Sequence, residues 1–374
     1  MKAFMRSVAI AAMAVAVPVT QLAAHESEEH ALDAARVEAM RAATVAFLES
    51  LDDAQRSQVM ASLDDNHART NWSNLPVGMA PRSGLAVADM APSQRIALHA
   101  MMAAALSSQG YLKTTTIMWH EDVLHDIAAG AIAAMPDSDP NKAQAQSFIA
   151  NYDTEKFFVS VFGDPSEKDW GWTVTGHHFA ANITVSDNRI AFTPLVLGAN
   201  PQIVKQGRYA GWRILQHEAD RVFALLASLK PDQVKQAVVA DAVDGAVFLG
   251  KGRESRLGAP AGIAASELDP VQLKLLHGLI DEYLGDASDE AAAQQRAAVK
   301  SDGMDSLYFA WWGPTDDPAA RYMFRVHGPS IVIDYVRERS GENEFNHVHS
   351  IARDPSNDYG AEWLERHYKE AHQD

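Results

Sequence analysis

Residues 84–94 (GLAVADMAPSQ) and residues 262–272 (GIAASELDPVQ) are two versions of one sequence pattern. Residues 47–55 (FLESLDDAQ) and 225–233 (LLASLKPDQ) repeat in the same way, and both pairs are separated by the same 178 positions. Two matched segments at one constant offset indicate an internal duplication, so the rest of the sequence is best compared half against half. We therefore expect two related halves.

The later parts of the two halves correspond more loosely. Residues 157–163 (FFVSVFG) match 307–313 (LYFAWWG), and residues 174–184 (VTGHHFAANIT) match 326–336 (VHGPSIVIDYV). These runs are rich in β-branched and aromatic residues and have the length of strands. Each half therefore combines a helical stretch with a strand-rich stretch that follows it.

The predicted fold class is α+β, because helical and strand patterns are grouped within each half. Apolar residues recur every three or four positions from Leu215 to Leu229, which predicts one buried helix face in the second half. We expect residues 25–208 and 209–374 to form two pseudo-symmetric repeats that pack into one compact domain.

The first 24 residues have the three-part pattern of a secretory signal peptide. Lys2 and Arg6 supply a positive start, residues 8–18 are apolar, and residues 22–24 (LAA) offer a small-residue cleavage site. No later stretch reaches the ~20 apolar residues that a transmembrane helix needs. We expect a periplasmic or secreted protein without a membrane span.

The net charge and the lack of cysteine exclude several kinds of partner and site. The chain has 374 residues, a formal net charge of −17 and no cysteine. The acidic balance argues against nucleic acid as a partner, because no basic surplus is available to neutralise phosphates. The lack of cysteine excludes disulfides, thiolate metal sites and thiol nucleophiles. The expected partner is a small-molecule substrate or ligand.

A His-x-His pattern near the C-terminus is the first candidate site. His347 and His349 flank Val348 in a strand-like run, so both imidazoles are expected on one face, together with Phe345 and Ile351. Two imidazoles side by side on a strand are a common way to hold a metal ion. The alternative is a histidine pair on a sheet surface with no ligand.

A second pair of histidines lies in the first half. If His177 and His178 belong to a strand, they point to opposite faces, and His177 is the more buried of the two. The corresponding positions of the second half carry Pro329 and Ser330. Each half thus contributes histidines that the other lacks, as one composite site between the halves requires.

Glu121 is a carboxylate on an apolar helix stripe, with Ile117, Leu124 and Ala128 on the same face. A buried carboxylate is unfavourable unless it is paired, protonated or bound to a metal. The residue is therefore a candidate general base or metal ligand, and a buried ion pair is the alternative.

Several longer motifs resemble one known family. They are GHHFAANITV (176–185), TPLVLGANP (193–201), HGPSIVIDY (327–335), NHVHSIARDP (346–355) and DYGAEWLERHY (358–368). These strings, spread over nearly the whole expected mature chain, resemble the domain of unknown function 3500 family of bacterial and fungal proteins. The resemblance implies no established activity. The candidate residues that fall in matching segments are Glu121, His177, His178, His347, His349, Arg353 and Asp354.

The leading hypothesis is an exported metal-dependent hydrolase with a histidine-rich site between the repeats. His177, His347 and His349 would bind the ion, with zinc expected first and iron or copper as alternatives, because imidazole suits all three. The other assigned residues are Glu121 as general base or fourth ligand, Arg353 as stabiliser of an anionic substrate or intermediate, and His178 and Asp354 as groups that contact substrate or support the ligands. The alternatives are a non-haem metal oxidase that uses the same histidines, a non-catalytic periplasmic ligand- or metal-binding protein, and a structural scaffold.

Overall fold

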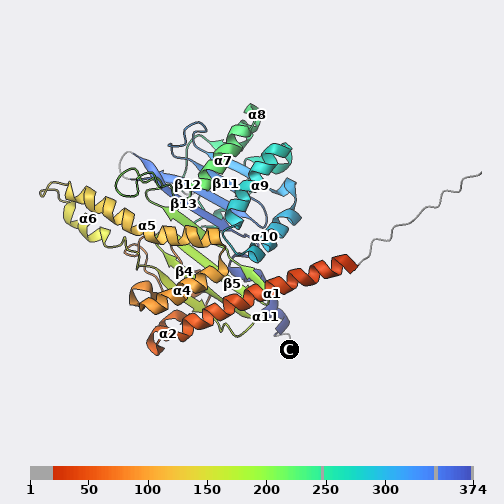
Figure 1. Ribbon diagram of the computed structural model, residues 1–374. Helices are drawn as coiled ribbons and strands as arrows, with labels where there is room; N and C mark the ends of the chain where they lie inside the picture. Colours follow the sequence, from red (N-terminus) through yellow and green to blue (C-terminus); the bar gives the residue numbers. More distant parts are fainter. Residues whose placement is uncertain (1–19, 246–247, 341–343, 372–374) are drawn as a thin grey trace, which may run out of the picture.

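A large mixed β-sheet forms the centre of the molecule (Figure 1). The computed structural model describes residues 20–245, 248–340 and 344–371. The strands follow one another in the order β1-β3-β4-β5-β7-β13-β12-β11-β10-β8, with β2, β6 and β9 paired beside β3, β5 and β10. Their bounds are β1 Met60–Ala61, β2 Leu85–Ala86, β3 Phe158–Phe162, β4 Asp169–Gly176, β5 Phe179–Ser186, β6 Arg189–Ala191, β7 Leu195–Ala199, β8 Val238–Ala240, β9 Ile263–Ala264, β10 Tyr308–Trp312, β11 Met323–His327, β12 Val332–Arg339 and β13 Phe345–Arg353.

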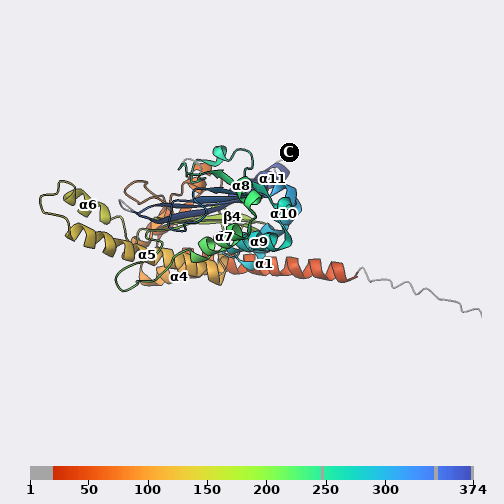
Figure 2. The ribbon, with the colours of Figure 1, turned by 90° about the horizontal axis from the view of Figure 1, so that it is seen from above.

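Helices cover one face of this sheet. Figure 1 shows α5, α7 and α9 crossing in front of the strands, and Figure 2 places α1, α4, α5, α7 and α9 on the same side of the sheet. The helix bounds are α1 Thr20–Glu49, α2 Asp53–Val59, α3 Asn66–Thr70, α4 Pro92–Ala105, α5 Ser108–Ala133, α6 Lys142–Ile149, α7 Gln216–Ser228, α8 Pro231–Ala237, α9 Pro270–Leu284, α10 Asp289–Asp302 and α11 Ala361–Ala371. Helices and strands are grouped rather than alternating, and the predicted α+β class is confirmed.

The two faces of the sheet are packed differently. The helical side holds the larger apolar core, in which Trp170, Trp172 and Trp311 are at most 1% exposed. The opposite side has a smaller core, in which loop residues such as Trp72 and Phe248 pack over the strands. Loops, with the ends of α3 and α11, therefore cover the face on which polar side chains of β12 and β13 lie.

Several elements recur at the offset found in the sequence. Helix α2 begins at Asp53 and α8 at Pro231, and α4 begins at Pro92 and α9 at Pro270, so both pairs are 178 residues apart. Proline suits the first turn of a helix, where the missing N–H has no helical acceptor. The strand pairs β1 with β3 and β8 with β10 are both parallel, whereas the strand pairs nearer the middle of the sheet are antiparallel.

The starts of α4 and α9 are fixed by the same hydrogen bonds. The side chain of Gln94 accepts from the backbone N–H of Ala91 at 2.8 Å, and that of Gln272 accepts from the N–H of Asp269 at 2.9 Å. Each glutamine also donates to a backbone carbonyl at the end of an earlier helix, Ser50 after α1 at 2.9 Å and Ser228 of α7 at 2.8 Å. These bonds satisfy backbone groups that a helix start otherwise leaves open.

The two parts of the chain meet at the middle of the sheet and at the start of α5. Strands β7 and β13 pair antiparallel in the sheet centre. On the helical side the Ser107 N–H donates to Asp286 O, and the Ser288 N–H donates to Ala105 O, each at 3.1 Å. These two hydrogen bonds flank an isolated antiparallel β-bridge between Leu106 and Ala287.

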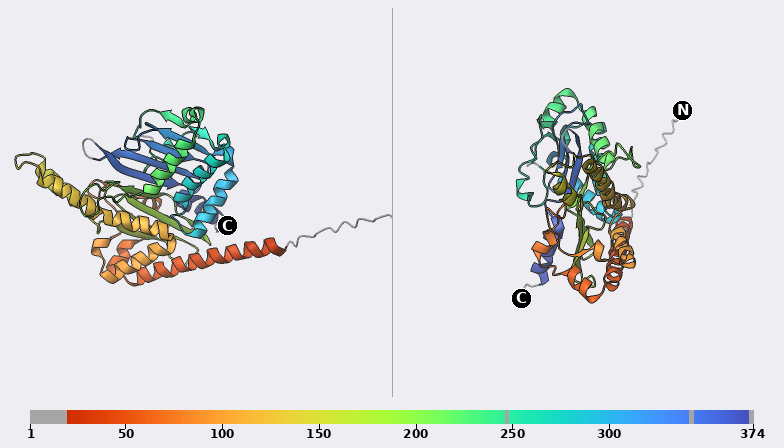
Figure 3. Two further views of the ribbon diagram at one scale, coloured as in Figure 1. Left: turned by 45° about the horizontal axis from the view of Figure 1, so that its top comes forward. Right: turned by 90° about the vertical axis from the view of Figure 1, so that its left-hand side faces the viewer.

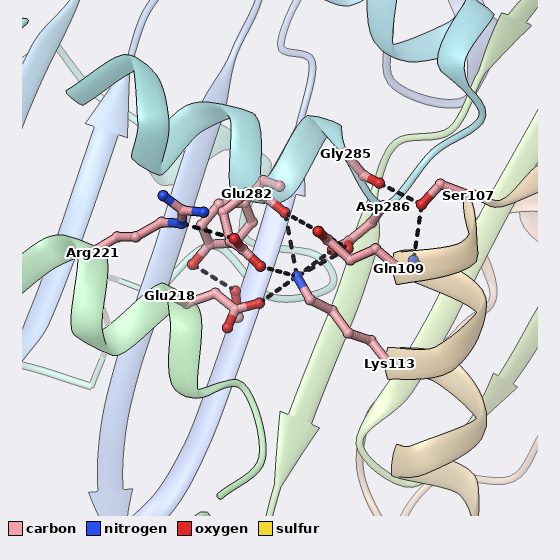
Figure 4. A network of polar contacts seen from close by, with 11 residues as sticks. Ser107, Gln109, Lys113, Glu218, Arg221, Glu282, Gly285 and Asp286 are labelled. Atoms are coloured by element: carbon pink, nitrogen blue, oxygen red, sulfur yellow. Dashed lines mark hydrogen bonds and ion pairs between the residues drawn. The ribbon is translucent and has the colours of Figure 1, made fainter. Parts of the chain in front are cut away.

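A buried charge network, the lysine cluster, ties α5 to α7 and α9 (Figure 4). Lys113 Nζ lies 2.7 Å from Glu218, 2.9 Å from Glu282 and 2.9 Å from Asp286. The three carboxylate side chains are at most 3% exposed. Arg221 adds a second cation, with its Nε 2.8 Å from Glu282. The cluster therefore contains its own positive charge.

Helix α1 extends away from the body of the molecule towards the N-terminus (Figure 3). It begins at Thr20, and residues 1–19 lie outside the described residues, so most of the predicted signal peptide (1–24) is not described. Within the described part of the chain, no helix has a stretch long and apolar enough to cross a membrane.

Candidate metal centre

Strand β13 presents two histidines to the loop-covered side of the sheet. It pairs with β12 on one side and with β7 on the other, where His349 lies opposite Gly198. The rings of His347 and His349 have centroids 4.5 Å apart, so both side chains lie on one face, as the alternation predicts. Val348, between them, is fully buried in the core of the helical side.

The prediction that His177 and His178 belong to a strand is wrong. Strand β4 ends at Gly176 and β5 begins at Phe179, so the two histidines form the two-residue turn of a hairpin. His178 has a φ of 62°, in the left-handed region that costs a non-glycine residue roughly 1–2 kcal/mol. Such strain is concentrated at functional sites. Because a turn does not alternate between faces, the assignment of His177 as the buried member fails too, and His178 is the more buried at 1% exposed.

The turn brings His178, rather than His177, to the histidines of β13. His178 Nε2 lies 3.0 Å from His347 Nε2. One ring nitrogen from each of His178, His347 and His349 lies within 4.8 Å of the others. These residues form the three-histidine site. Imidazole nitrogens at this spacing suit one ion with metal–nitrogen bonds of ~2.0–2.1 Å.

Gly198 makes room for this convergence. A Cβ atom at this position would lie 2.9 Å from Cδ2 of His349 and 3.2 Å from Cδ2 of His178. Contacts that short would require the neighbouring atoms to move. The absence of a side chain in the middle of β7 therefore lets imidazoles from the β4–β5 turn and from β13 approach each other across that strand.

The outer edges of the three imidazoles are held by acceptors. His349 Nδ1 lies 2.8 Å from Glu338 Oε2, and His178 Nδ1 lies 3.4 Å from Glu121 Oε1. The imidazole of His347 forms a hydrogen bond with the backbone of Arg339. An acceptor on one ring nitrogen fixes the tautomer and leaves the other nitrogen free to bind a metal, which is the usual support of metal-bound histidine. Glu338 holds His349 in this way, and Glu121 lies within ion-pair distance of His178 while its hydrogen bond is with His177.

Glu121 is 1% exposed, in agreement with the apolar stripe on α5. Its second oxygen, Oε2, lies 2.9 Å from His177 Nδ1, so the carboxylate contacts both histidines of the turn. Glu121, His177 and His178 form a second group with candidate ligand atoms within 4.8 Å. Burial, and next Asp122, raise the pKa of Glu121 well above its usual range.

The surroundings of His178 and His347 favour the neutral form of both imidazoles. Burial is the main cause that lowers the pKa of His178 well below its usual range, and the neighbouring His177 and His347 lower it further. Burial likewise lowers the pKa of His347 to about 3. Metal binding requires unprotonated imidazole, so these environments favour the ligand form of the histidines.

Arg353 and Asp354 lie away from the three-histidine site. Arg353 follows His349 by four residues on β13, roughly 13 Å at the rise of an extended strand. Its guanidinium group pairs with Glu254 at 2.7 Å and Asp358 at 2.9 Å. Asp354 accepts from backbone N–H groups of the turn that follows. The structure therefore separates these two residues from the histidines with which the sequence analysis grouped them.

Sequence reasoning missed two residues of the site, Glu338 and Gly198. Glu338 lies opposite His347 in the β12–β13 ladder, which places it on the same face as the histidines. Its only signal is a charged residue at the end of a β-branched run, and the strand pairing that makes it meaningful is long-range. The same holds for Gly198, because the imidazoles beside it come from β13 and from the β4–β5 turn.

Comparison with known proteins gives one match. Neither the curated proteins nor the solved structures contain a match to this chain. A family model described as protein of unknown function (DUF3500) matches residues 33–361, which covers most of the chain and both groups of candidate ligands. The chain belongs to the DUF3500 family.

Proposed function

We propose that His178, His347 and His349 bind one divalent metal ion, with zinc as the first candidate. The observation that carries the proposal is the convergence of three buried or half-buried imidazoles whose outer nitrogens are already held. Three neutral nitrogens suit zinc, copper or iron, and three protein ligands with a water as the fourth are the usual set of a catalytic zinc site.

We propose hydrolysis as the reaction. A three-histidine zinc site leaves one position open, and a bound zinc ion lowers the pKa of water there to about 7. His347 is only half-buried, which supports access from solvent to the open position. Glu121 already contacts two imidazoles, so its proposed part is to orient His178 rather than to act on the substrate.

Metal analysis of the purified protein tests the metal site. We expect one zinc ion per chain in the wild type, and loss of that ion in His178→Ala and His349→Ala. His177→Ala should keep the ion, because His177 lies outside the three-histidine site. The exposed His67 provides a control as His67→Ala. A wild type that binds no metal, or a His349→Ala variant with full metal content, contradicts the proposal.

Activity assays test the reaction separately. We expect turnover on a panel of simple carboxylic and phosphate esters, its loss after metal removal and its recovery when zinc is added back. A chain that binds zinc in the three-histidine site but hydrolyses none of the panel would instead support a non-catalytic metal-binding protein.

We also propose that residues 25–208 and 209–374 are duplicated halves of one domain. The repeated offset of 178 residues in α2 and α8, and in α4 and α9, supports this, as do the matching glutamine hydrogen bonds. An experimental structure should superpose residues 43–101 on 221–279 with these helices in register. Different helix directions in the two segments would contradict the duplication.

The protein is proposed to be exported to the periplasm or beyond. The support is the pattern of Lys2, Arg6 and the apolar residues 8–18. N-terminal sequencing of the protein recovered from a periplasmic extract should begin after Ala24, whereas a mature chain that retains Met1 would contradict export by cleavage.

A further inference from the structure

A cavity of about 590 Å³ lies at the far end of β13 from the three-histidine site. It is bordered by the end of β13, by the loop at residues 249–257 and by the turn that follows Asp354. Its wall combines apolar side chains, among them Leu249 and Val332, with the charged side chains of Lys251, Glu254, Arg353 and Asp358. The volume is within the ~300–1,000 Å³ typical of small-molecule sites.

Two cations, Lys251 and Arg353, and two acids, Glu254 and Asp358, line this cavity, and two further arginines lie near its wall in a chain of net charge −17. Arg69 is buried and donates to the backbone carbonyl of Tyr359, which lines the cavity. Lys251 lies on the wall, and after burial the nearby Arg82 is the main cause that lowers its pKa. In an acidic protein, cations gathered at one cavity favour an anionic ligand.

Three of these cations lack a carboxylate partner. Arg82 donates to the backbone carbonyls of Ser73, Leu75 and Ala80, and Lys251 donates to the side chain of Asn71 at 2.6 Å. Within the described residues, no carboxylate lies within 4 Å of the charged group of Arg69, Arg82 or Lys251. Arg69 is buried and Arg82 half-buried, where guanidinium groups are normally paired, so their lack of a carboxylate partner is unusual, whereas Lys251 is exposed.

Arg353 is paired, but one of its partners is exchangeable. The side chain of Arg353 is 3% exposed. It forms ion pairs with the carboxylates of Asp358 and Glu254. Glu254 is 47% exposed and belongs to a short 3-10 turn in a glycine-containing loop. Arg353 Nη1 has no hydrogen-bond partner among the described residues. A carboxylate from outside can therefore replace Glu254 with the same paired geometry.

Tyr359, which has a strained backbone conformation, lines the cavity. Tyr359 has a φ of 62°, an unfavourable conformation for a bulky side chain. Its hydroxyl accepts a hydrogen bond from Trp72 Nε1 at 2.7 Å. Tyr359 thus stays fixed against the smaller apolar core, and it adds an aromatic surface to the cavity.

We propose that this cavity binds a small organic carboxylate with an apolar body, whose carboxylate group replaces Glu254 on Arg353 and lies near Lys251. The apolar wall residues would contact the body of the ligand. A carboxylate is favoured over a cation or a neutral molecule because the buried Nη1 of Arg353 has no hydrogen-bond partner and Lys251 has no carboxylate partner among the described residues. This proposal does not depend on a metal at the three-histidine site.

Isothermal titration calorimetry on the full mature protein with octanoate tests the proposal. Octylamine has the same body with the opposite charge, and inorganic phosphate is an oxyanion with no apolar body. We expect octanoate to bind with a millimolar or lower dissociation constant, and we expect no measurable binding of octylamine or phosphate under the same conditions.

Two variants then locate the ligand. Glu254→Gln removes the competing carboxylate from an exposed position and should tighten octanoate binding about fivefold. Lys251→Met should weaken it about fivefold, the size expected for one partly exposed charge pair. Glu267→Gln removes an exposed acid elsewhere and should leave the dissociation constant unchanged.

Each remaining outcome overturns the proposal. Absence of octanoate binding, or equal binding of octylamine, contradicts an anionic ligand. Phosphate binding as tight as that of octanoate contradicts an apolar body. An octanoate affinity that is unchanged in Glu254→Gln places the ligand elsewhere.

Discussion

Helix α5 contributes to two buried polar clusters that balance their charges in different ways. Near its start, Lys113 lies among Glu218, Glu282 and Asp286. Two turns later, Glu121 contacts His177 and His178 of the β4–β5 turn. His178 also belongs to the three-histidine site, so Glu121 and that site form one histidine cluster. Both clusters bury carboxylates almost completely, so each needs compensation for the loss of water.

The lysine cluster supplies its compensation from the chain, whereas the histidine cluster does not. Lys113 contacts all three acids, and Arg221 contacts Glu282. In the described residues, no lysine or arginine lies within 4 Å of Glu121 or Glu338, and the groups that contact them are imidazoles with no fixed charge. The comparison teaches that one cluster is complete as folded, while a cation from outside would complete the other.

Removing the internal cation should have the largest effect. Lys113→Met leaves three buried acids with one partner, Arg221, and should lower the free energy of unfolding by about 3–5 kcal/mol. Urea denaturation measures this. Lys235→Met, at a side chain 77% exposed, should change stability by less than about 0.5 kcal/mol. A similar small effect for both variants would mean that the lysine cluster is not held by charge.

Adding a cation should stabilise the histidine cluster. Zinc at 100 times its dissociation constant should raise the free energy of unfolding of the metal-free wild type by about 2.7 kcal/mol, because zinc binds only the folded state. Thermal denaturation with and without zinc gives the shift. His178→Ala should show no such shift, and an equal shift in that variant would place the ion elsewhere.

Glu338→Gln should separate support of the ligands from ligation. The amide still accepts a hydrogen bond from His349 but without a charge, so zinc should bind about 10–100-fold more weakly while the stoichiometry stays the same. Competition with a chelator measures the affinity. Asp126→Asn, with a side chain 88% exposed on α5, is the matched control. Full loss of the ion in Glu338→Gln would make Glu338 a ligand.

The pH dependence of stability provides a further test of the lysine cluster. Burial raises the pKa of Asp286 from its usual 3.8 to about 7. Because the folded-state pKa of Asp286 lies above its unfolded value, the protonated carboxyl favours the folded state. This contribution to stability is complete below about pH 4 and is lost as pH rises through 7. Stability relative to Asp286→Asn should therefore fall between these pH values, by at most about 1.4 kcal/mol per unit. A difference that stays constant, or that grows with pH, contradicts this assignment.

The sequence was sufficient for features that depend on local periodicity. The His-x-His pattern of β13 and the apolar stripe around Glu121 follow from the two-residue and 3.6-residue repeats of regular structure, and both are found in the structure. The repeated segments 84–94 and 262–272 likewise predict the matched starts of α4 and α9.

What failed depends on turns and long-range pairing. His177 and His178 form a hairpin turn without the glycine or asparagine that normally marks a left-handed position, so the sequence gives no local signal for it. The partnership of Glu338 with His349 requires the register of two strands, and Lys113 meets acids more than 100 residues away. Such contacts are invisible until the topology is known.

The outermost strands of the sheet have a consequence for behaviour at high concentration. Strands β1 and β8 end the sheet with only two and three residues, Met60–Ala61 and Val238–Ala240. A long open edge would offer a row of unpaired N–H and C=O groups to another copy and invite fibre-like association. Because each edge is so short, little template for such growth is left, and the protein should remain dispersed in concentrated solution.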